Sequence, residues 1–149
     1  MSTKKTKQAA PQKTAADPMA TLIAAAHQIR EKAYAPYSRY HVGSAVLADN
    51  GKIYQGANVE NASYGLSICA ERNAVSAAIL DGARRILACA VVTASDPPAA
   101  PCGVCRQTLA EFAPRDRDVQ IALVNGDGKR RDTMLSTLLP MAFLPEDLE

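Results

Sequence analysis

The sequence predicts an α/β fold in one domain, and three observations lead to that prediction. Short β-branched apolar runs alternate along the chain with longer segments whose apolar residues recur at helical spacing. The 149 residues are 48% hydrophobic, which suits one domain with a substantial core. The chain also contains no internal repeat that would indicate a second unit.

Residues 1–18 differ in composition from the rest of the chain. They are rich in Lys, Thr, Gln, Ala and Pro and lack an apolar period, so we expect a disordered, solvated tail, followed by a single domain over 19–149. A targeting or nucleic-acid-binding arm is the alternative for this segment. Four of the lysines lie there, so the body is close to neutral under a net charge of +2. A nearly neutral body disfavours a nucleic-acid surface built on bulk charge.

The first half of the domain is expected to form one helix and one hairpin. Asp17 can cap a helix over 18–33 that starts with Pro18, and one apolar stripe runs along it through Leu22, Ile23, Ala26 and Ile29. The run 42–48 is β-rich, 49–51 has turn chemistry and 53–56 is a second strand. We interpret His27 and His41 as structural residues rather than metal ligands.

The second half alternates between helices and strands. In chain order we expect a helix over 67–79 that ends near 81–82, a buried central strand over 86–93, a helix over 102–112, a strand over 119–125 and a short helix over 133–139. Cys89 lies inside the central strand with no Cys or His nearby, so we interpret it as a core residue outside any site.

Three cysteines carry the strongest functional signal. Cys102 and Cys105 lie in PCGVCR with a spacing that lets both sulfurs face one tetrahedral ion, and Cys69 precedes Glu71 in CAER. A Cys-x-x-Cys pair alone is more often a structural knuckle or a redox pair. Three ligands beside a spare carboxylate indicate a catalytic zinc site that keeps a position for water. CAE followed by PCxxC is typical of zinc-dependent nucleobase deaminases, in which the Glu is the general acid and base.

Three thiolates around a divalent ion leave a negative cluster, which requires compensation. Arg72 and Arg106 are adjacent in sequence to Glu71 and Cys105, where they could donate hydrogen bonds to sulfur. A solvated helix face is the alternative for both. We favour the compensating role for Arg72 and leave Arg106 open. The cysteines are also expected at helix N-termini, which stabilise thiolates.

Five ordered blocks resemble the homotetrameric, three-cysteine class of cytidine deaminase. They are PYSRYHVG at 36–43, NVENASYG at 58–65, CAER at 69–72, PCGVCRQ at 101–107 and LLPMAFLPEDL at 138–148. The resemblance implies a three-layer cytidine deaminase-like fold, with a mixed sheet of about five strands and helices on both faces. It also implies zinc-dependent hydrolysis of cytidine and deoxycytidine to uridine and deoxyuridine, in pyrimidine salvage.

The same resemblance implies residue roles. Cys69, Cys102 and Cys105 would bind zinc, Glu71 would move protons, and Asn58 and Glu60 would hold the ribose hydroxyl. The remaining substrate contacts would come from Tyr40 beside the pyrimidine, the backbone of Ala62, and Phe143 reaching into a neighbouring subunit's site. The family usually has Phe in place of Tyr40 and often Gly in place of Leu144.

Other classes remain as alternatives. A deaminase of the same fold could act on another cytosine nucleoside such as blasticidin S, although the Asn58 and Glu60 pair suits a ribose. A nucleic-acid editing protein is disfavoured because the chain has only five Tyr and two Phe. A purely structural zinc would leave Glu71 without a role. Without an apolar signal segment or a membrane-spanning run, we expect a cytoplasmic protein that binds a nucleoside and neither membrane nor nucleic acid.

Overall fold

A computed structural model describes residues 17–149, and five strands form one mixed sheet within this range. The tail predicted over 1–18 falls, apart from its last two residues, outside the described residues. The sheet order is β2-β1-β3-β4-β5, with only the β3–β4 pair parallel. The strands are β1 (Gly43–Ala48), β2 (Ile53–Ala57), β3 (Ile86–Thr93), β4 (Gln120–Asn125) and β5 (Arg130–Met134).

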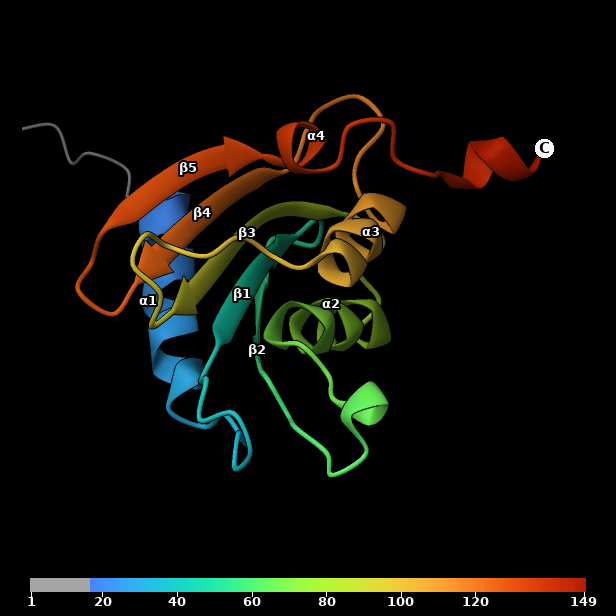
Figure 1. Cartoon of the computed structure of the whole chain (residues 1–149). Helices are drawn as coiled ribbons and strands as arrows, with labels where there is room; N and C mark the ends of the chain where they lie inside the picture. The colour runs from blue at the N-terminus through green and yellow to red at the C-terminus, as the bar shows by residue number, and fades with distance from the viewer. Residues whose placement is uncertain (1–16) are drawn as a thin grey trace, which may run out of the picture.

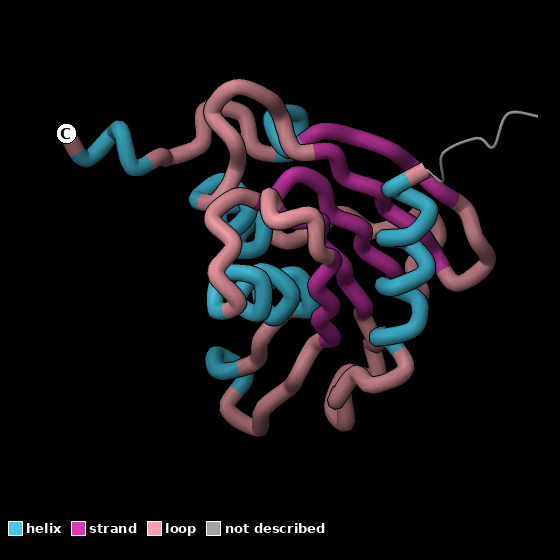
Figure 2. Tube along the Cα trace, turned by 180° about the vertical axis from the view of Figure 1, so that it is seen from behind, coloured by secondary structure: helices cyan, strands magenta, loops and turns pink. Residues whose placement is uncertain are grey.

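Helices cover both faces of this sheet, as the resemblance implied. Helix α1 (Pro18–Arg30) packs on one face, and α2 (Ala70–Leu80) and α3 (Gly103–Glu111) pack on the other (Figures 1 and 2). The short α4 (Leu135–Leu138) follows β5, and the single-turn 3₁₀ helices η1 (Tyr64–Leu66) and η2 (Pro145–Leu148) lie in connecting and C-terminal segments. The three-layer α/β fold is therefore confirmed.

Successive side chains of a strand point to opposite faces of the sheet, so the strands contribute to two separate hydrophobic cores. Small side chains face α1, among them Ala45, Ala90 and Ala122, and let that helix lie close to the sheet. Larger apolar residues of the same strands point to the opposite face, where they pack with α2 and α3. Cys89 is one of them and is fully buried, so its assignment to the core is confirmed. None of the helices between residues 17 and 149 has the length and hydropathy that a membrane span requires.

Two predicted helices, one over 133–139 and one starting at residue 67, were wrong in part. The helix expected over 133–139 is strand β5 up to Met134 and helix only from Leu135, because the polar β5 is an edge strand whose side chains are mostly exposed. The helix expected from residue 67 starts at Ala70, with Cys69 as its N-cap. Ile68 is instead extended and pairs with Val59.

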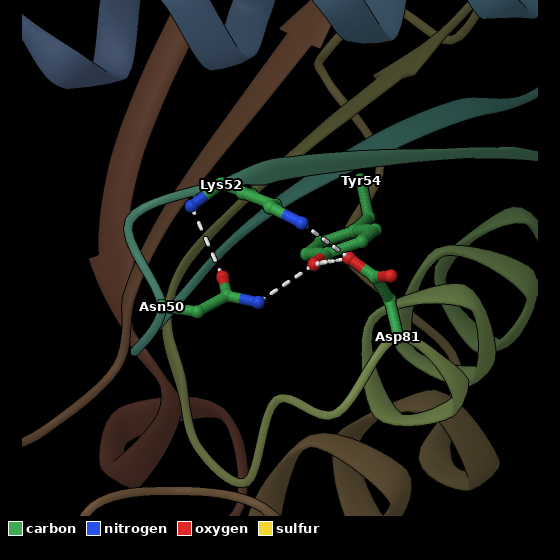
Figure 3. Close-up of polar contacts among 4 residues, drawn as sticks. All are labelled: Asn50, Lys52, Tyr54 and Asp81. Carbon is green, nitrogen blue, oxygen red and sulfur yellow. Dashed lines mark hydrogen bonds and ion pairs between the residues drawn. The ribbon is translucent and has the colours of Figure 1, made fainter.

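Helix α2 is fixed at its C-terminal end by a polar cluster on the surface. The carboxylate of Asp81, the C-cap residue, accepts hydrogen bonds from Lys52 Nζ at 2.8 Å and from the Tyr54 hydroxyl at 2.6 Å (Figure 3). Asn50 donates to the same Tyr54 hydroxyl at 2.7 Å. The hydrogen bond from Lys52 and that from Tyr54 lower the pKa of Asp81. The cluster ties the end of α2 to the β1–β2 hairpin.

The N-terminal end of α2 is positioned by a close approach to β2. A Cβ atom at Gly56 would lie 2.3 Å from the Ala70 carbonyl oxygen and 2.4 Å from the Ala74 nitrogen. Both atoms belong to the helix backbone, which cannot move without moving the whole first turn. Gly56 therefore sets where Cys69 and Glu71 stand above the sheet.

We expect Gly56→Ala to destabilise the protein, because overpacking against backbone typically costs about 1–3 kcal/mol. In a chain of this size that corresponds to a melting temperature lower by about 3–10 °C. Gly126→Ala is the matched control, since a Cβ there meets only the Arg30 guanidinium at 3.7 Å. Calorimetry that gave equal melting temperatures for the two variants would contradict the close approach.

Candidate metal centre and substrate pocket

The three predicted ligand cysteines come together although 33 residues separate Cys69 from Cys102. Their sulfur atoms all lie within 4.8 Å of one another, with Cys69 to Cys102 at 3.8 Å and Cys102 to Cys105 at 3.6 Å. Cys69 is the N-cap of α2 and Cys102 the N-cap of α3, while Cys105 lies in the first turn of α3. The expected placement at helix N-termini is confirmed, and all four cysteines are free thiols.

The donor set fits zinc. A tetrahedral zinc with bonds of about 2.3 Å to sulfur places two ligand sulfurs about 3.8 Å apart, which agrees with the observed spacing. Within residues 17–149 no other group of His, Cys, Asp or Glu is arranged to hold a metal. His27 and His41 lie outside the cluster, and three ligands leave the fourth position for water or substrate.

Glu71 is a buried residue that lines the pocket together with Cys69 and Cys102. Its side chain stands in the first turn of α2 and the residue is only 4% exposed. Burial raises the pKa of its carboxyl, and the nearby Cys69 thiolate raises it further, while a hydrogen bond from the Cys105 thiol opposes the shift. A carboxylate with a raised pKa is a stronger base than an exposed one.

The pKa values of the Cys69 and Cys105 thiols are shifted in opposite directions. Hydrogen bonds from Cys105 and, to a lesser extent, Cys102 and the positive charge of Arg72 lower the pKa of the Cys69 thiol to about 6, although its burial opposes this. The hydrogen bond to Cys69 and burial raise the pKa of Cys105. Cys69 thus becomes a thiolate, the form that binds metal, at a lower pH than Cys105.

The two arginines next to the site have different positions. Arg72 is half-buried, and its charge acts on Cys69. Arg106, which the sequence left open, points elsewhere: its Nε donates to the Pro101 carbonyl at 2.7 Å and its Nη1 to the Leu138 carbonyl at 2.7 Å. Arg106 therefore links α3 to α4 rather than facing the sulfurs.

A cavity of about 280 Å³ opens beside the sulfurs. Its lining joins the metal cluster to the predicted substrate residues: Tyr40, Val42, Asn58, Glu60, Ser67, Ile68, Cys69, Ala70, Glu71, Val91, Thr93, Ala99, Ala100 and Cys102. Such a lining is largely apolar with a few polar groups, as in most small-molecule sites. The sequence did not lead us to expect Thr93 in the pocket. The feature that marks it is a polar residue at the end of an otherwise apolar strand.

Asn58 and Glu60 both lie in the pocket, yet each also supports the neighbouring loop. The Asn58 side chain accepts from the Val42 N–H at 2.9 Å and donates to the Tyr40 carbonyl at 2.8 Å. Glu60 Oε2 accepts from the N–H groups of Tyr37 and Ser38, and Oε1 accepts from the Ser38 hydroxyl. The hydrogen bond from the Ser38 hydroxyl is the largest cause that lowers the pKa of Glu60.

After these contacts, the side chains of Asn58 and Glu60 each retain some hydrogen-bonding capacity for a ligand. The Asn58 amide has a second N–H, and a carboxylate with about four lone-pair sites retains one after three hydrogen bonds. A hydroxyl between the two side chains could accept from Asn58 and donate to Glu60. Their support of residues 36–42 has no signal in the sequence.

Tyr40 lies in the pocket lining, and its hydroxyl has a partner. Its phenol oxygen is 2.7 Å from Ser95 Oγ, in the loop that connects β3 to α3. Ser95 is 55 residues away in sequence, so sequence reasoning missed it. The aromatic ring can therefore face the pocket while its polar end is satisfied outside it.

Ala62 and Phe143 lie outside the pocket lining of this chain. Ala62 is exposed in a turn before η1, and Phe143 is 58% exposed. Phe143 belongs to the C-terminal segment, which extends away from the body of the protein beyond α3 (Figures 1 and 2). Leu144 is partly buried against the larger core, and its main chain accepts from Asp147 N at 2.9 Å at the start of η2.

The chain is similar to known proteins over most of its length. Residues 18–122 match the family model described as the cytidine and deoxycytidylate deaminase zinc-binding region. A cytidine deaminase of Halalkalibacterium halodurans is 48% identical over 127 residues, covering 85% of this chain and 95% of the relative. One from Sporosarcina psychrophila is 46% identical over 127 residues, covering 85% and 92%.

Solved structures agree with these relatives. A crystal structure of cytidine deaminase from Burkholderia pseudomallei superposes with a TM-score of 0.78 at 47% identity, covering 83% of this chain and 98% of that one. The cytidine deaminase of Mycobacterium tuberculosis superposes with a TM-score of 0.72 at 40% identity, covering 85% and 98%.

Proposed function

The chain belongs to the cytidine and deoxycytidylate deaminase family, and from that premise we propose that it hydrolyses the 4-amino group of cytidine and deoxycytidine. The products are uridine or deoxyuridine and ammonia. The observation that carries the proposal is the cluster of three sulfurs with the buried Glu71 at the head of one pocket. Pyrimidine salvage is the role such a reaction serves.

Glu71 moves the protons of this reaction. Hydrolysis adds water to C4 of the ring, adds a proton to the ring nitrogen N3, and then protonates the departing amine. Cys69, Cys102 and Cys105 would hold zinc, which would make the attacking water more acidic, with a pKa of about 7. The Glu71 carboxylate takes a proton from the attacking water and donates it to N3; it then takes the proton of the new C4 hydroxyl and gives it to the amine, which leaves as ammonia as the C4–N bond breaks. Its burial keeps bulk water away from these transfers.

Arg72 and the helix N-termini offset the charge of the thiolates. Without them a zinc with three thiolates would carry a net negative charge, which would weaken its effect on water. The half-buried Arg72 supplies one positive charge next to Cys69, and the starts of α2 and α3 supply partial positive charge. We assign no such role to Arg106, because its guanidinium bonds two backbone carbonyls.

Asn58 and Glu60 hold a ribose hydroxyl through the hydrogen-bonding capacity that the loop leaves free, and Tyr40 packs beside the pyrimidine. The same pocket is lined by these groups and by Cys69, Glu71 and Cys102. A substrate that lacks the sugar loses these hydrogen bonds and the positioning that they provide. Free cytosine should therefore be a very poor substrate.

We expect Glu60→Ala to lower kcat/KM for cytidine by about 10- to 100-fold and to change the much lower kcat/KM for cytosine far less. Since Glu60 also holds the 37–38 backbone, Ser38→Ala is the matched control. It removes the Ser38 hydroxyl, which donates to Glu60 and accepts from the Tyr40 N–H, and it keeps the carboxylate. Kinetics on both substrates separate the roles: an equal loss on cytidine and cytosine would assign Glu60 to loop support alone.

The family resemblance and the exposed C-terminal segment support a homotetramer with shared sites. In it Phe143 would reach into the pocket of a neighbouring subunit, which accords with its exposure, and the backbone of Ala62 would contact the base. Four free thiols, three of them metal ligands, suit a reducing compartment and thus the cytoplasm. The single domain over 19–149 is part of the same proposal.

A substrate panel tests the proposed function. Purified protein with zinc is mixed separately with cytidine, deoxycytidine, cytosine and CMP, and deamination is followed by ultraviolet absorbance. Turnover of the two nucleosides with weak turnover of cytosine and CMP is expected, because the pocket offers no Gly-rich phosphate cradle and Glu60 repels added negative charge. Failure to deaminate either nucleoside would overturn the proposal. Blasticidin S is not favoured, since the relatives are cytidine deaminases.

A further inference from the structure

Tyr40 and Ser95 join two loops that border the pocket from different parts of the chain. Tyr40 ends the 36–40 segment that precedes β1, and Ser95 stands in the loop 94–102 between β3 and α3. Their hydroxyl oxygens are 2.7 Å apart, and either can donate. Tyr40, Ala99 and Ala100 line the pocket, and the second loop ends in the metal ligand Cys102.

Further hydrogen bonds hold the backbone of both Tyr40 and Ser95. The Tyr40 carbonyl accepts from Asn58 Nδ2 at 2.8 Å, and its N–H donates to Ser38 Oγ at 3.0 Å. On the other loop, the Ser95 N–H donates to Thr93 Oγ1 at 3.3 Å, and Thr93 is itself buried in the pocket lining. The hydroxyl pair therefore connects two anchored segments.

We propose that the Tyr40–Ser95 hydrogen bond is a clasp that fixes the loop 94–100 against the 36–40 segment and so sets the width of the pocket beside the pyrimidine. This inference rests on the proposed function for its substrate. Tyr40 touches the substrate in this account, whereas Ser95 acts through Tyr40 and is a positioning residue. A Phe at position 40 would keep the aromatic ring and lose the clasp.

The clasp acts on binding rather than on chemistry. Within residues 17–149 neither hydroxyl makes a hydrogen bond to Glu71 or to a sulfur of the cluster, so losing the bond should raise KM and leave kcat unchanged. A hydrogen bond between neutral groups is worth about two- to tenfold in an equilibrium constant. Because each single variant already breaks the bond, the second substitution should add nothing.

The test is a double-mutant cycle on zinc-loaded protein with cytidine. The variants are Tyr40→Phe, Ser95→Ala and their combination, with Ser95→Thr as the conservative variant that keeps a hydroxyl. Tyr34→Phe is the matched control, since its hydroxyl makes no hydrogen bond within residues 17–149 and the residue is 55% exposed. Hydrogen exchange of peptides covering 94–100 provides a readout that does not require turnover.

The clasp predicts a two- to tenfold higher KM in all three variants that lack it, near-normal values for Ser95→Thr and Tyr34→Phe, and faster exchange over 94–100. Multiplicative effects in the double variant, a fall in kcat without a change in KM, or unchanged KM would overturn it. If the parent protein does not deaminate cytidine, the proposed function fails. Hydrogen exchange then decides alone, and equal exchange over 94–100 in all proteins would refute the clasp.

Discussion

Glu71→Gln should abolish turnover of cytidine while leaving zinc bound. The amide has nearly the shape of the carboxylate, but it cannot accept the proton from water or return it to N3 and the leaving amine. Loss of a general acid or base typically costs about 10²- to 10⁴-fold, and the upper end applies because one group makes several transfers. Steady-state kinetics and zinc analysis of the same preparation measure both parts.

Glu111→Gln is the matched control for this substitution. Glu111 is the exposed last residue of α3 and lies outside the pocket lining, so removing its charge should leave kcat unchanged. Near-normal turnover by the Glu71→Gln protein with bound zinc would refute the role of Glu71. Loss of zinc from that variant would instead assign Glu71 to the integrity of the metal centre.

Cys102→Ala should remove the metal and with it the activity. Two sulfurs remain, and the exposed side of the cluster then loses its ligand. Since zinc contributes several kcal/mol to lowering the barrier, we expect turnover to fall by about 10³-fold or more. Metal analysis should show the zinc content falling towards zero, and added zinc should not restore normal kinetics.

Cys89→Ala controls for the loss of a thiol as such. This cysteine is buried in the core and contacts Ser44 Oγ at 3.5 Å, outside the sulfur cluster. The variant should keep its zinc and its activity, with a lower melting temperature from the small cavity. Equal loss of zinc in the two variants would contradict the three-cysteine metal centre.

The strands with strong apolar character could be predicted from the sequence, and the polar one could not. The central run 86–93 is β3 without any change of boundary, because both faces of the strand are buried and select apolar residues. Strand β5 reads RRDTM and has only one side to pair with. At an edge most side chains face solvent, so neither an apolar run nor strict alternation marks it.

The cluster of three cysteines could be predicted from the sequence because metal chemistry restricts residue type and spacing together. The contacts that shape the pocket do not have this property. Asn58 and Glu60 use most of their hydrogen-bonding capacity on backbone groups of residues 37–42, and backbone partners leave no trace in residue type. The link from Tyr40 to Ser95 depends on two loops meeting in space, which no local pattern encodes.

The most direct test of hydrolytic deamination at this site is the fate of the solvent oxygen. Zinc-loaded protein is incubated with cytidine in water enriched in ¹⁸O, and uridine and ammonia are measured together, beside the Glu71→Gln protein. We expect equimolar uridine and ammonia from the parent protein, with one solvent oxygen incorporated at C4, and essentially no product from the variant. Unconverted cytidine, or the same yield from both proteins, would contradict it.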